Sequence, residues 1–239
     1  MLAHRQFAEV ATEEPSPSQA AAGYVIQQFK NTQHTSPIGG VSKRVTDIII
    51  ALFALVALIP IMLIVAISLK LTGGPVIFAQ TRIGYNGKPF RCYKFRTMLS
   101  NADALLDRHL ATDPDAAREW RKSRKLKRDP RITWIGNVLR KSSLDELPQL
   151  INVLGGDMSC VGPRPILKVE LENYGAYVQD YLRVRPGLTG IWQVSGRSNI
   201  EYPERVLLDS SYVRNWTWWG DWVILAKTTV AITKFDDAG

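Results

Sequence analysis

The sequence predicts an α+β protein, mainly helical, in which a membrane-embedded helix is followed by a cytoplasmic domain with a small β-hairpin and interfacial amphipathic helices. The first observation is a run from Ile48 to Leu69 that contains no charged residue. The second is an Asn-Gly pair between two short β-rich runs, which is typical of a hairpin. The third is a C-terminal stretch whose tryptophans recur at helical spacing.

Composition limits the classes of partner. The chain has 239 residues, a net charge of +8 and a pI near 9.6. An excess of this size favours an anionic partner, which could be nucleic acid, anionic lipid or a phosphorylated substrate. The two cysteines, Cys92 and Cys160, form no spacing motif, and so few thiols favour a reducing compartment.

The chain divides into three segments. Residues 1–40 are expected to form a disordered tail, because they contain few large apolar residues and no clear periodicity. They also lack the apolar core of a signal peptide. Residues 41–72 then form the membrane helix, and residues 73–239 form the domain on its cytoplasmic side.

The membrane segment is defined by its length. As a helix, its 22 uncharged residues would extend roughly 33 Å, which matches a hydrocarbon core of about 30 Å. The basic bulk of the chain follows Lys70, so the positive-inside rule keeps that side cytoplasmic, and a simple span would export Lys43 and Arg44 against the same rule. Pro60 deprives the carbonyl of Val56 of its helical partner and predicts a kink, which would let both ends return to one face. The residues alone leave spanning and re-entrant helices open.

Basic residues are concentrated in two stretches of the following domain. The predicted hairpin turns at Asn86-Gly87, and its cations form either a solvated edge or a face turned toward lipid or phosphate: Arg82, Lys88, Arg91, Lys94 and Arg96. Residues 118–141 hold ten Lys/Arg and two Asp/Glu. This second run lies between the membrane segment and an acidic pair, so an anionic ligand or phospholipid surface is expected beside it.

The acidic pair is Asp145-Glu146. Ser143 and Glu146 have the spacing of a capping box ahead of an apolar run. With Ser143 as N-cap, however, Pro148 would fall inside the helix, where its missing N–H removes a hydrogen bond. Pro148 is better placed as the first helical residue. Asp145 and Glu146 would then lie in the preceding turn and could face a ligand, so the pair either caps a helix or performs chemistry.

A third cluster is rich in glycine and proline. It comprises "LGGDMSCVGPRP" and "RVRPGLTGIWQVSGR", whose turns each hold one arginine: Arg164, Arg185 and Arg197. An arginine fixed in a rigid turn is a good fork for phosphate. Four of the seven tryptophans follow in "NWTWWGDW", where Trp218, Trp219 and Trp222 share a helical face. That face could belong to the core or to the membrane–water boundary.

These motifs together resemble those of the bacterial sugar transferases, the monotopic polyprenyl-phosphate hexose-1-phosphate transferases, and are closest to those that initiate exopolysaccharide synthesis. The matching stretches are "KRVTD", "RIGYNGKPFRCYKFRTM", "LRKSSLDELPQLINVLGGDMSCVGPRP" and "RPGLTGIWQVSGR". They occur in order from Lys43 onward. The resemblance implies that a UDP-hexose gives hexose-1-phosphate to undecaprenyl phosphate, with release of UMP.

The resemblance also assigns residues to roles. It implies that Asp145 is the nucleophile, which forms a phosphosugar–aspartate intermediate, and that Glu146 is associated with Mg²⁺. Covalent catalysis by a carboxylate would divide one difficult step into two, and a metal with arginines would neutralise the transferring group. The candidate substrate- and phosphate-binding residues are Arg140, Gly162, Pro163, Arg164, Pro165, Arg185, Gln193 and Arg197.

For the membrane segment the resemblance implies the re-entrant form at the cytoplasmic face of the bacterial inner membrane. Lys43 and Arg44 would then lie near lipid phosphates, with Asp47 positioned by or pairing with a basic residue. Many members have Ser before the kink proline, whereas this chain has Ile59 before Pro60, so another group must satisfy the freed carbonyl or the bend is shallower. Inner-membrane lipids, downstream glycosyltransferases and a second copy of the chain are expected partners.

Two rival functions predict different features. A membrane-anchored nucleic-acid binder should carry a helix-turn-helix, a zinc site or an RNA-binding aromatic pair, and the sequence contains none of these motifs, so no nucleic-acid partner is expected. A non-catalytic scaffold of polysaccharide assembly would not need Asp145 and Glu146. Substitution of the pair therefore distinguishes a scaffold from an enzyme.

Overall fold

The computed structural model describes residues 34–123, 126, 128–196 and 200–233. It is mainly helical, with one antiparallel hairpin and one short parallel strand pair, which confirms the predicted fold class. The elements are α2 (Gly40–Leu71), β1 (Ile77–Ile83), η1 (Tyr85–Gly87), β2 (Pro89–Phe95), α3 (Ala102–Thr112), α4 (Pro114–Ser123), α5 (Trp134–Lys141), η2 (Leu144–Glu146), α6 (Gln149–Gly155), β3 (Ser159–Val161), η3 (Lys168–Tyr177), α7 (Val178–Leu182), β4 (Gly187–Thr189), α8 (Ile191–Ser195), α9 (Tyr202–Arg214) and α10 (Trp218–Thr233).

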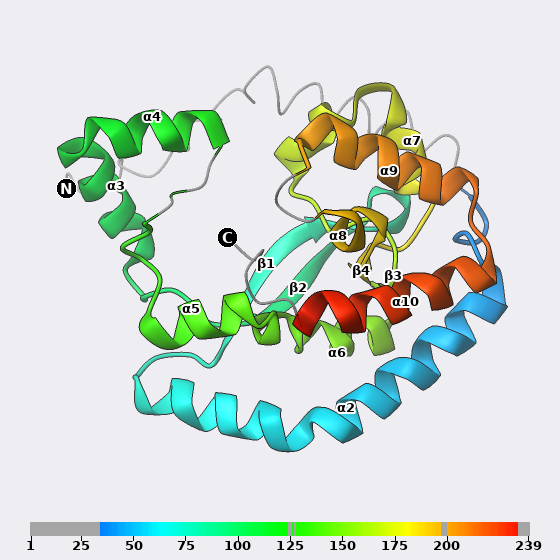
Figure 1. Cartoon of the computed structure of the whole chain (residues 1–239), viewed down its shortest axis with the longest axis horizontal. Helices are drawn as coiled ribbons and strands as arrows, with labels where there is room; N and C mark the ends of the chain where they lie inside the picture. Colours follow the sequence, from blue (N-terminus) through cyan, green and yellow to red (C-terminus); the bar gives the residue numbers. More distant parts are fainter. Residues whose placement is uncertain (1–33, 124–125, 127, 197–199, 234–239) are drawn as a thin grey trace, which may run out of the picture.

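Helix α2 is the predicted membrane helix. It runs for 32 residues with Pro60 inside it, and Figure 1 shows it as a bent arc along the lower edge of the molecule, apart from the hairpin. Only 11% of its most apolar 18-residue window is buried. The exposed large side chains include Leu52, Phe53, Val56, Leu63 and Ile64. An apolar surface of this extent is expected to be covered by hydrocarbon.

The N-terminal end of α2 is fastened to the domain by a buried ion pair. The ammonium of Lys43 lies 2.6 Å from a carboxylate oxygen of Asp221 in α10, and both side chains are buried. The same carboxylate accepts hydrogen bonds from the hydroxyl of Tyr212 and the indole N–H of Trp216. The expectation that Lys43 meets lipid phosphates is therefore wrong, because its charge is neutralised inside the protein.

Arg44 and Asp47 also face inward. The guanidinium of Arg44 donates to the carbonyls of Val153 and Leu154 at the end of α6, where a helix presents unpaired carbonyls and the negative end of its dipole. Asp47 accepts from the hydroxyl of Ser159 at 3.0 Å and from a backbone N–H at 2.9 Å, both in β3. The expected lipid contact of Arg44 is replaced by contacts with α6. Asp47 is held by β3, and the basic residue whose charge it meets is Arg185.

The hairpin forms at the predicted turn. Strands β1 and β2 pair antiparallel from Ile77↔Phe95 to Ile83↔Pro89. Asn86 and Gly87 have φ values of 54° and 70°, the left-handed conformation that these two residue types tolerate best. Strand β2 buries Phe90 and Cys92 on one face and Phe95 on the other, and Lys94 extends from the face of Cys92 toward η2.

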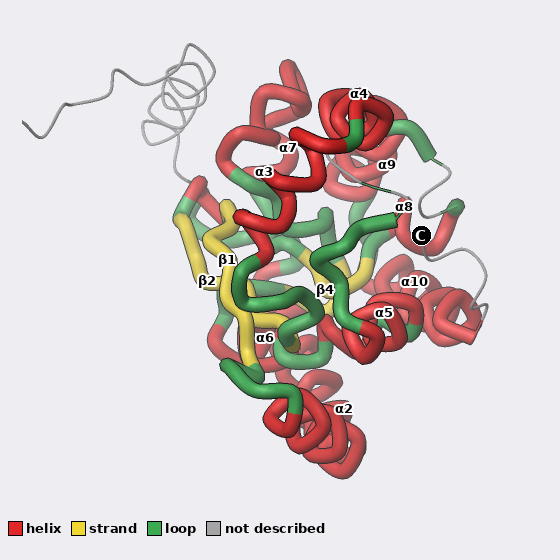
Figure 2. The backbone as a smooth tube through the Cα atoms, turned by 90° about the vertical axis from the view of Figure 1, so that its left-hand side faces the viewer, coloured by secondary structure: helices red, strands yellow, loops and turns green. Residues whose placement is uncertain are grey.

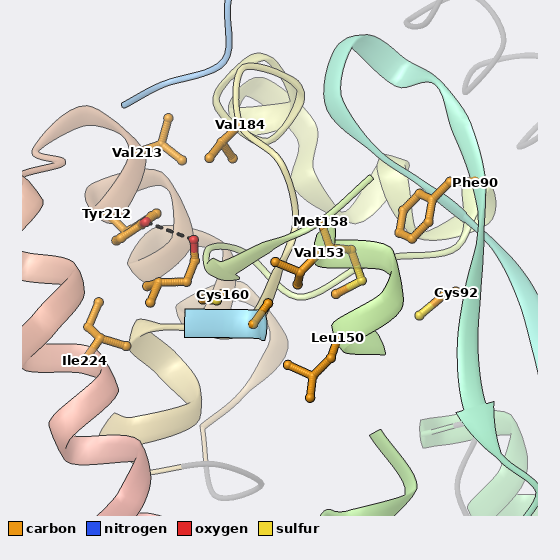
Figure 3. Close-up of a cluster of buried hydrophobic side chains, with 12 residues drawn as sticks. Phe90, Cys92, Leu150, Val153, Met158, Cys160, Val184, Tyr212, Val213 and Ile224 are labelled. Carbon is orange, nitrogen blue, oxygen red and sulfur yellow. Dashed lines mark hydrogen bonds between the residues drawn. The ribbon is translucent and has the colours of Figure 1, made fainter. Parts of the chain in front are cut away.

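A mixed core joins the membrane helix to the domain. Ala51 of α2, Cys92 of β2, Val153 of α6 and Ile224 of α10 belong to one buried cluster, whose side chains converge in Figure 3. Tyr212 lies in the same cluster, and its hydroxyl oxygen lies 3.1 Å from the carbonyl oxygen of Val161. The core therefore holds α2, the hairpin and α10 in fixed relative positions.

The end of the predicted tail is packed rather than disordered. The backbone carbonyl of His34 accepts from the side chains of Tyr85 and Asn86, and the N–H of Ile38 donates to the carbonyl of Arg183. Residues 34–40 thus belong to the domain, which corrects the predicted boundary at residue 40. The remainder of the predicted tail, residues 1–33, lies outside the described residues.

Two helices of the domain expose aromatic side chains. Trp219 of α10 is 73% exposed and Trp134 of α5 is 81% exposed, while the indole N–H of Trp218 donates to the hydroxyl of Thr46 in α2. Figure 2 places α5 and α10 next to α2, and α3 and α4 at the opposite edge. The tryptophan face of α10 is therefore not core, and it has the position expected of the membrane–water boundary.

Candidate active site

The acidic pair lies in a tight turn between α5 and α6. Ser143 has φ 57° and makes no capping hydrogen bond with its side chain, so the capping-box interpretation is wrong. The short η2 segment carries Asp145 and Glu146, and Pro148 directly precedes the first residue of α6. The prediction that the pair lies in the turn ahead of this helix is confirmed.

Glu146 is held by two cations. The ammonium of Lys94 in β2 lies 2.7 Å from Oε1, and the guanidinium of Arg164 lies 2.8 Å from Oε1 and 3.5 Å from Oε2. Burial works to raise the pKa of Glu146, but the charges and hydrogen bonds of Arg164 and Lys94 outweigh it and hold the pKa at about 2. Glu146 is therefore an anion throughout the physiological range.

Asp145 has the opposite environment. Its side chain is buried, and within the described residues its carboxylate accepts no hydrogen bond. Burial is the largest influence on its pKa and the charge of Glu146 is the second, so the pKa rises to about 6 in spite of Lys94, Arg164 and Arg140. A desolvated carboxylate of raised pKa, ionised at neutral pH, is a stronger nucleophile than a solvated one.

The surroundings of the pair are strongly cationic. Arg140 donates from Nε to the hydroxyl of Thr97, and its charge reaches Asp145. Arg82 lines, together with Lys94, Glu146 and Arg164, a cavity of about 10 Å³, which is room for about one water molecule. Four cations around two carboxylates leave a net positive field that suits an anionic substrate.

Two of these cations were not singled out by the sequence. Lys94 and Arg82 appear there only as members of a basic hairpin, since nothing in the local pattern separates them from Lys88 or Arg91. Arg82 lies on the other strand, opposite Phe90, and had no such signal. For Lys94 the available signal was its period-2 spacing from the buried Cys92, because side chains an even number of residues apart in one strand share a face. Lys94 satisfies that rule and Arg91 does not.

The Gly-Pro-Arg-Pro turn is braced by β4. The N–H of Gly162 donates to the carbonyl of Thr189, and the carbonyl of Pro163 accepts from the N–H of Gly187. A Cβ on Gly162 would lie 2.6 Å from the carbonyl oxygen of Arg185, so only glycine fits this close approach. The turn delivers Arg164 to Glu146, while the carbonyl of Pro165 accepts from Arg82.

The other predicted phosphate ligands lie elsewhere. Arg185 donates to the carbonyl of Gly156, just past the C-terminal end of α6, whereas the acidic pair precedes the N-terminal end of that helix. The structure therefore does not bring Arg185 to the acidic pair, and its predicted phosphate contact stays a prediction. Gln193 donates weakly to the carbonyl of Leu188, and its buried Oε1 has no partner among the described residues. Arg197 lies outside the described residues.

The acidic pair fits a divalent cation only if the substrate completes the ligand set. No group of three or more His, Cys, Asp or Glu side chains that could hold a metal occurs within the described ranges. Both Glu146 oxygens already accept from cations. Mg²⁺ is commonly held by one or two carboxylates together with substrate phosphates, and Asp145 and Glu146 can supply such a minimal set.

Comparison with known proteins places the chain in a family. Residues 38–235 match the family model described as "Bacterial sugar transferase". The chain is 51% identical over 214 residues to an exopolysaccharide production protein, ExoY, of Sinorhizobium fredii, covering 89% of this chain and 94% of that protein. It is 50% identical over 196 residues to the undecaprenyl-phosphate galactose phosphotransferase of Salmonella typhimurium, covering 82% of this chain but only 41% of that longer protein.

A third relative names a different sugar. The UDP-glucose:undecaprenyl-phosphate glucose-1-phosphate transferase of Caulobacter vibrioides is 38% identical over 205 residues, covering 82% of this chain and 71% of that protein. The family match extends over the membrane helix, the acidic pair and the Gly-Pro-Arg-Pro turn. The chain therefore belongs to the bacterial sugar transferases and is a membrane-associated phosphoglycosyl transferase.

Proposed function

We propose that the protein transfers hexose-1-phosphate from a UDP-hexose to undecaprenyl phosphate through a phosphosugar–aspartate intermediate on Asp145, as the first step of an exopolysaccharide repeat unit. The observation that carries the proposal is the contrast within the acidic pair. Asp145 is buried with a pKa of about 6, and Glu146 beside it is kept anionic by Lys94 and Arg164. The relatives' names supply the substrate class.

In the first step a carboxylate oxygen of Asp145 attacks the phosphorus that carries the hexose. The bond from that phosphorus to the bridging oxygen of the diphosphate breaks, and UMP leaves with the electron pair. Lys94, Arg164 and Arg140 surround the site of attack with positive charge, which offsets the negative charge of the transferring group. Their positions are fixed before substrate arrives, so little reorganisation is needed during the reaction.

In the second step a phosphate oxygen of undecaprenyl phosphate attacks the same phosphorus. The acyl phosphate bond breaks, Asp145 regains its carboxylate, and undecaprenyl-diphospho-hexose is released. Mg²⁺, when held by Asp145, Glu146 and the diphosphate, would add charge neutralisation at the leaving oxygens. The re-entrant form of α2, with both ends at the cytoplasmic face, would keep Asp145 on the side where nucleotide sugars are made.

The proposal is tested by trapping the intermediate. Purified protein with Mg²⁺ is incubated with a UDP-hexose labelled in the phosphate nearest the sugar, without undecaprenyl phosphate. The wild type is expected to retain label in an acyl phosphate that hydroxylamine removes, with one UMP released per label. Asp145→Asn should retain none and should lower turnover by about 10³ or more, roughly 4 kcal/mol of barrier.

The matched control is Asp107→Asn, which changes an exposed carboxylate of α3 and should label normally. Excess chelator should abolish both labelling and turnover, and added Mg²⁺ should restore them. Turnover without any covalent label would show that the transfer occurs by direct displacement in one step, without the aspartate intermediate. If the Asp145→Asn variant shows no turnover but still supports polysaccharide assembly in cells, the protein acts as a scaffold.

A further inference from the structure

A second cavity lies away from the acidic pair. It has a volume of about 350 Å³ and is enclosed by α8, the end of α9 and α10. Since a water molecule occupies about 30 Å³ of liquid volume, this space could hold on the order of ten waters or part of a hydrocarbon chain. Its apolar walls include Ile191, Val194, Val223 and Ile224, which make it a poor site for a purely polar ligand.

One wall of the cavity is the junction that fastens the membrane helix. Tyr212 and Trp216 both line the cavity, and both donate hydrogen bonds to Asp221. Asp221 in turn pairs with Lys43 of α2. Anything that fills the cavity therefore packs against the residues that position the start of the membrane helix.

The mouth of the cavity adjoins the expected membrane surface. Val223 lines the cavity and is also 53% exposed, and the neighbouring Trp219 and Trp222 are exposed on the same helix. Trp218 is bonded to Thr46, two residues before the uncharged run of α2 begins. Val223 thus joins the cavity to the exposed apolar face of α10, and the tryptophans of that face are of the type found where head groups meet hydrocarbon.

The rim carries a positive charge. Lys227 lines the cavity, is exposed, and forms no ion pair within residues 34–123, 126, 128–196 and 200–233. Lysine at a membrane surface attracts anionic head groups. The apolar walls and the basic rim together match an amphiphile that has a hydrocarbon chain below a phosphate.

We propose that this cavity binds an anionic phospholipid of the bilayer, with part of one acyl chain between α8, α9 and α10 and the head-group phosphate at Lys227. The bound chain supports the Tyr212–Asp221–Lys43 junction and so fixes the angle at which α2 enters the membrane. This site is separate from the transfer reaction, since none of its lining residues belongs to the acidic pair or to the Gly-Pro-Arg-Pro turn.

The test uses phosphatidylglycerol with a photoreactive group in its acyl chain. The full-length protein is placed in phosphatidylcholine nanodiscs containing this lipid, without UDP-hexose, and crosslinked peptides are identified by mass spectrometry. Labelling of the α8, α9 and α10 residues that line the cavity is expected. Phosphatidylcholine with the same photoreactive chain should label them at least about fivefold less.

Three variants and a matched control locate the site. Lys227→Gln should lower the phosphatidylglycerol labelling at least about fivefold, and Lys227→Arg should restore it. Ser211→Trp places a large side chain at the exposed rim and should exclude the chain without changing the charge. Lys168→Gln removes an exposed lysine on η3 and should label like the wild type. Circular dichroism of each variant in phosphatidylcholine nanodiscs establishes that it is folded.

Three results would overturn the proposal. The first is wild-type labelling of the cavity in a folded Lys227→Gln variant. The second is equal labelling by the two head groups. The third is displacement of phosphatidylglycerol by an equal mole fraction of undecaprenyl phosphate, which would make the cavity an acceptor site instead. Because labelling needs no turnover, these outcomes do not depend on whether Asp145 acts as the nucleophile.

Discussion

The pKa values of two adjacent carboxylates shift in opposite directions because the two side chains have different neighbours. Asp145 and Glu146 are neighbours in the chain and both are buried or nearly so, yet among the described residues only Glu146 forms ion pairs, with Lys94 and Arg164. Pairing stabilises the charged form and desolvation destabilises it, so the pKa of Glu146 is lowered and that of Asp145 is raised. The cations therefore act in two ways: they attract the anionic substrate, and by keeping Glu146 ionised they help to raise the pKa of Asp145.

The first prediction concerns pH. Asp145 must be deprotonated to attack, and its raised pKa means that activity falls as the pH drops through about 6. Lys94 lowers the pKa of Asp145, so Lys94→Met should move the acid limb of the kcat/KM profile to higher pH. Arg91→Met, an exposed position on the other face of β2, is the control and should leave the limb in place. An unchanged limb in Lys94→Met would show that Lys94 does not act on Asp145.

The second prediction concerns the fork at Arg164. Its guanidinium reaches both oxygens of Glu146, which an ammonium cannot do in the same plane. Arg164→Lys should reduce turnover about tenfold or more, or roughly 1.4 kcal/mol of barrier, as measured by UMP release. Arg183→Lys, at an exposed position, should be neutral. Near wild-type turnover of Arg164→Lys would reduce Arg164 to a structural role.

At the scale of elements, the turn before the acidic pair depends on an unusual backbone conformation. Ser143 adopts the left-handed region without being glycine, and a β-branched residue there is strained by about 1–2 kcal/mol. Ser143→Val should lower the thermal unfolding midpoint and turnover together, because the strain lies two residues before Asp145. Ser143→Gly should retain both. Equal loss in the two variants would assign the effect to the hydroxyl instead of the backbone.

The bend of α2 gives a second prediction at this scale. Pro60 cannot donate to the carbonyl of Val56, so Pro60→Ala should straighten the helix and favour a span that exports the N-terminus. A cysteine is placed at the exposed Ser36 position in a background without Cys92 and Cys160. Its labelling by a membrane-impermeant thiol reagent in intact cells shows on which side of the membrane the N-terminus lies.

The wild-type helix should protect this cysteine until the inner membrane is opened, and Pro60→Ala should expose part of it and lose activity. Ile59→Ala, which keeps the proline, should behave as the wild type. External labelling with Pro60 in place would refute the re-entrant arrangement.

At the scale of the molecule, the membrane helix and the catalytic domain form one unit through the buried Lys43–Asp221 pair. Removing one partner leaves an uncompensated charge, which costs about 3–5 kcal/mol in such sites. Lys43→Met and Asp221→Asn should each lower the unfolding midpoint in detergent strongly, and the double variant should lose less than the sum. Additive losses would mean that the two side chains do not stabilise each other.

Features that depend on local pattern could be predicted from the amino-acid sequence. The uncharged run predicts α2 because its length matches a bilayer, and Asn86-Gly87 predicts the hairpin because these residues tolerate positive φ. Pro148 excludes a helix through the acidic pair, so the turn at Asp145 could be predicted as well. Each of these signals is contained in fewer than about thirty residues, the length of one membrane helix or hairpin.

Which charged side chains pair with each other depends on how the chain folds. Lys43 pairs with Asp221, which is 178 residues away in the sequence, and Lys94 pairs with Glu146, which is 52 residues away. A cation's local sequence is the same whether it faces lipid, substrate or a buried carboxylate, so Lys43 and Arg44 were predicted at the membrane and Lys94 was not singled out. Burial is a property of the packed chain, and it is burial that makes the pairing of Lys43 and the raised pKa of Asp145 energetically important.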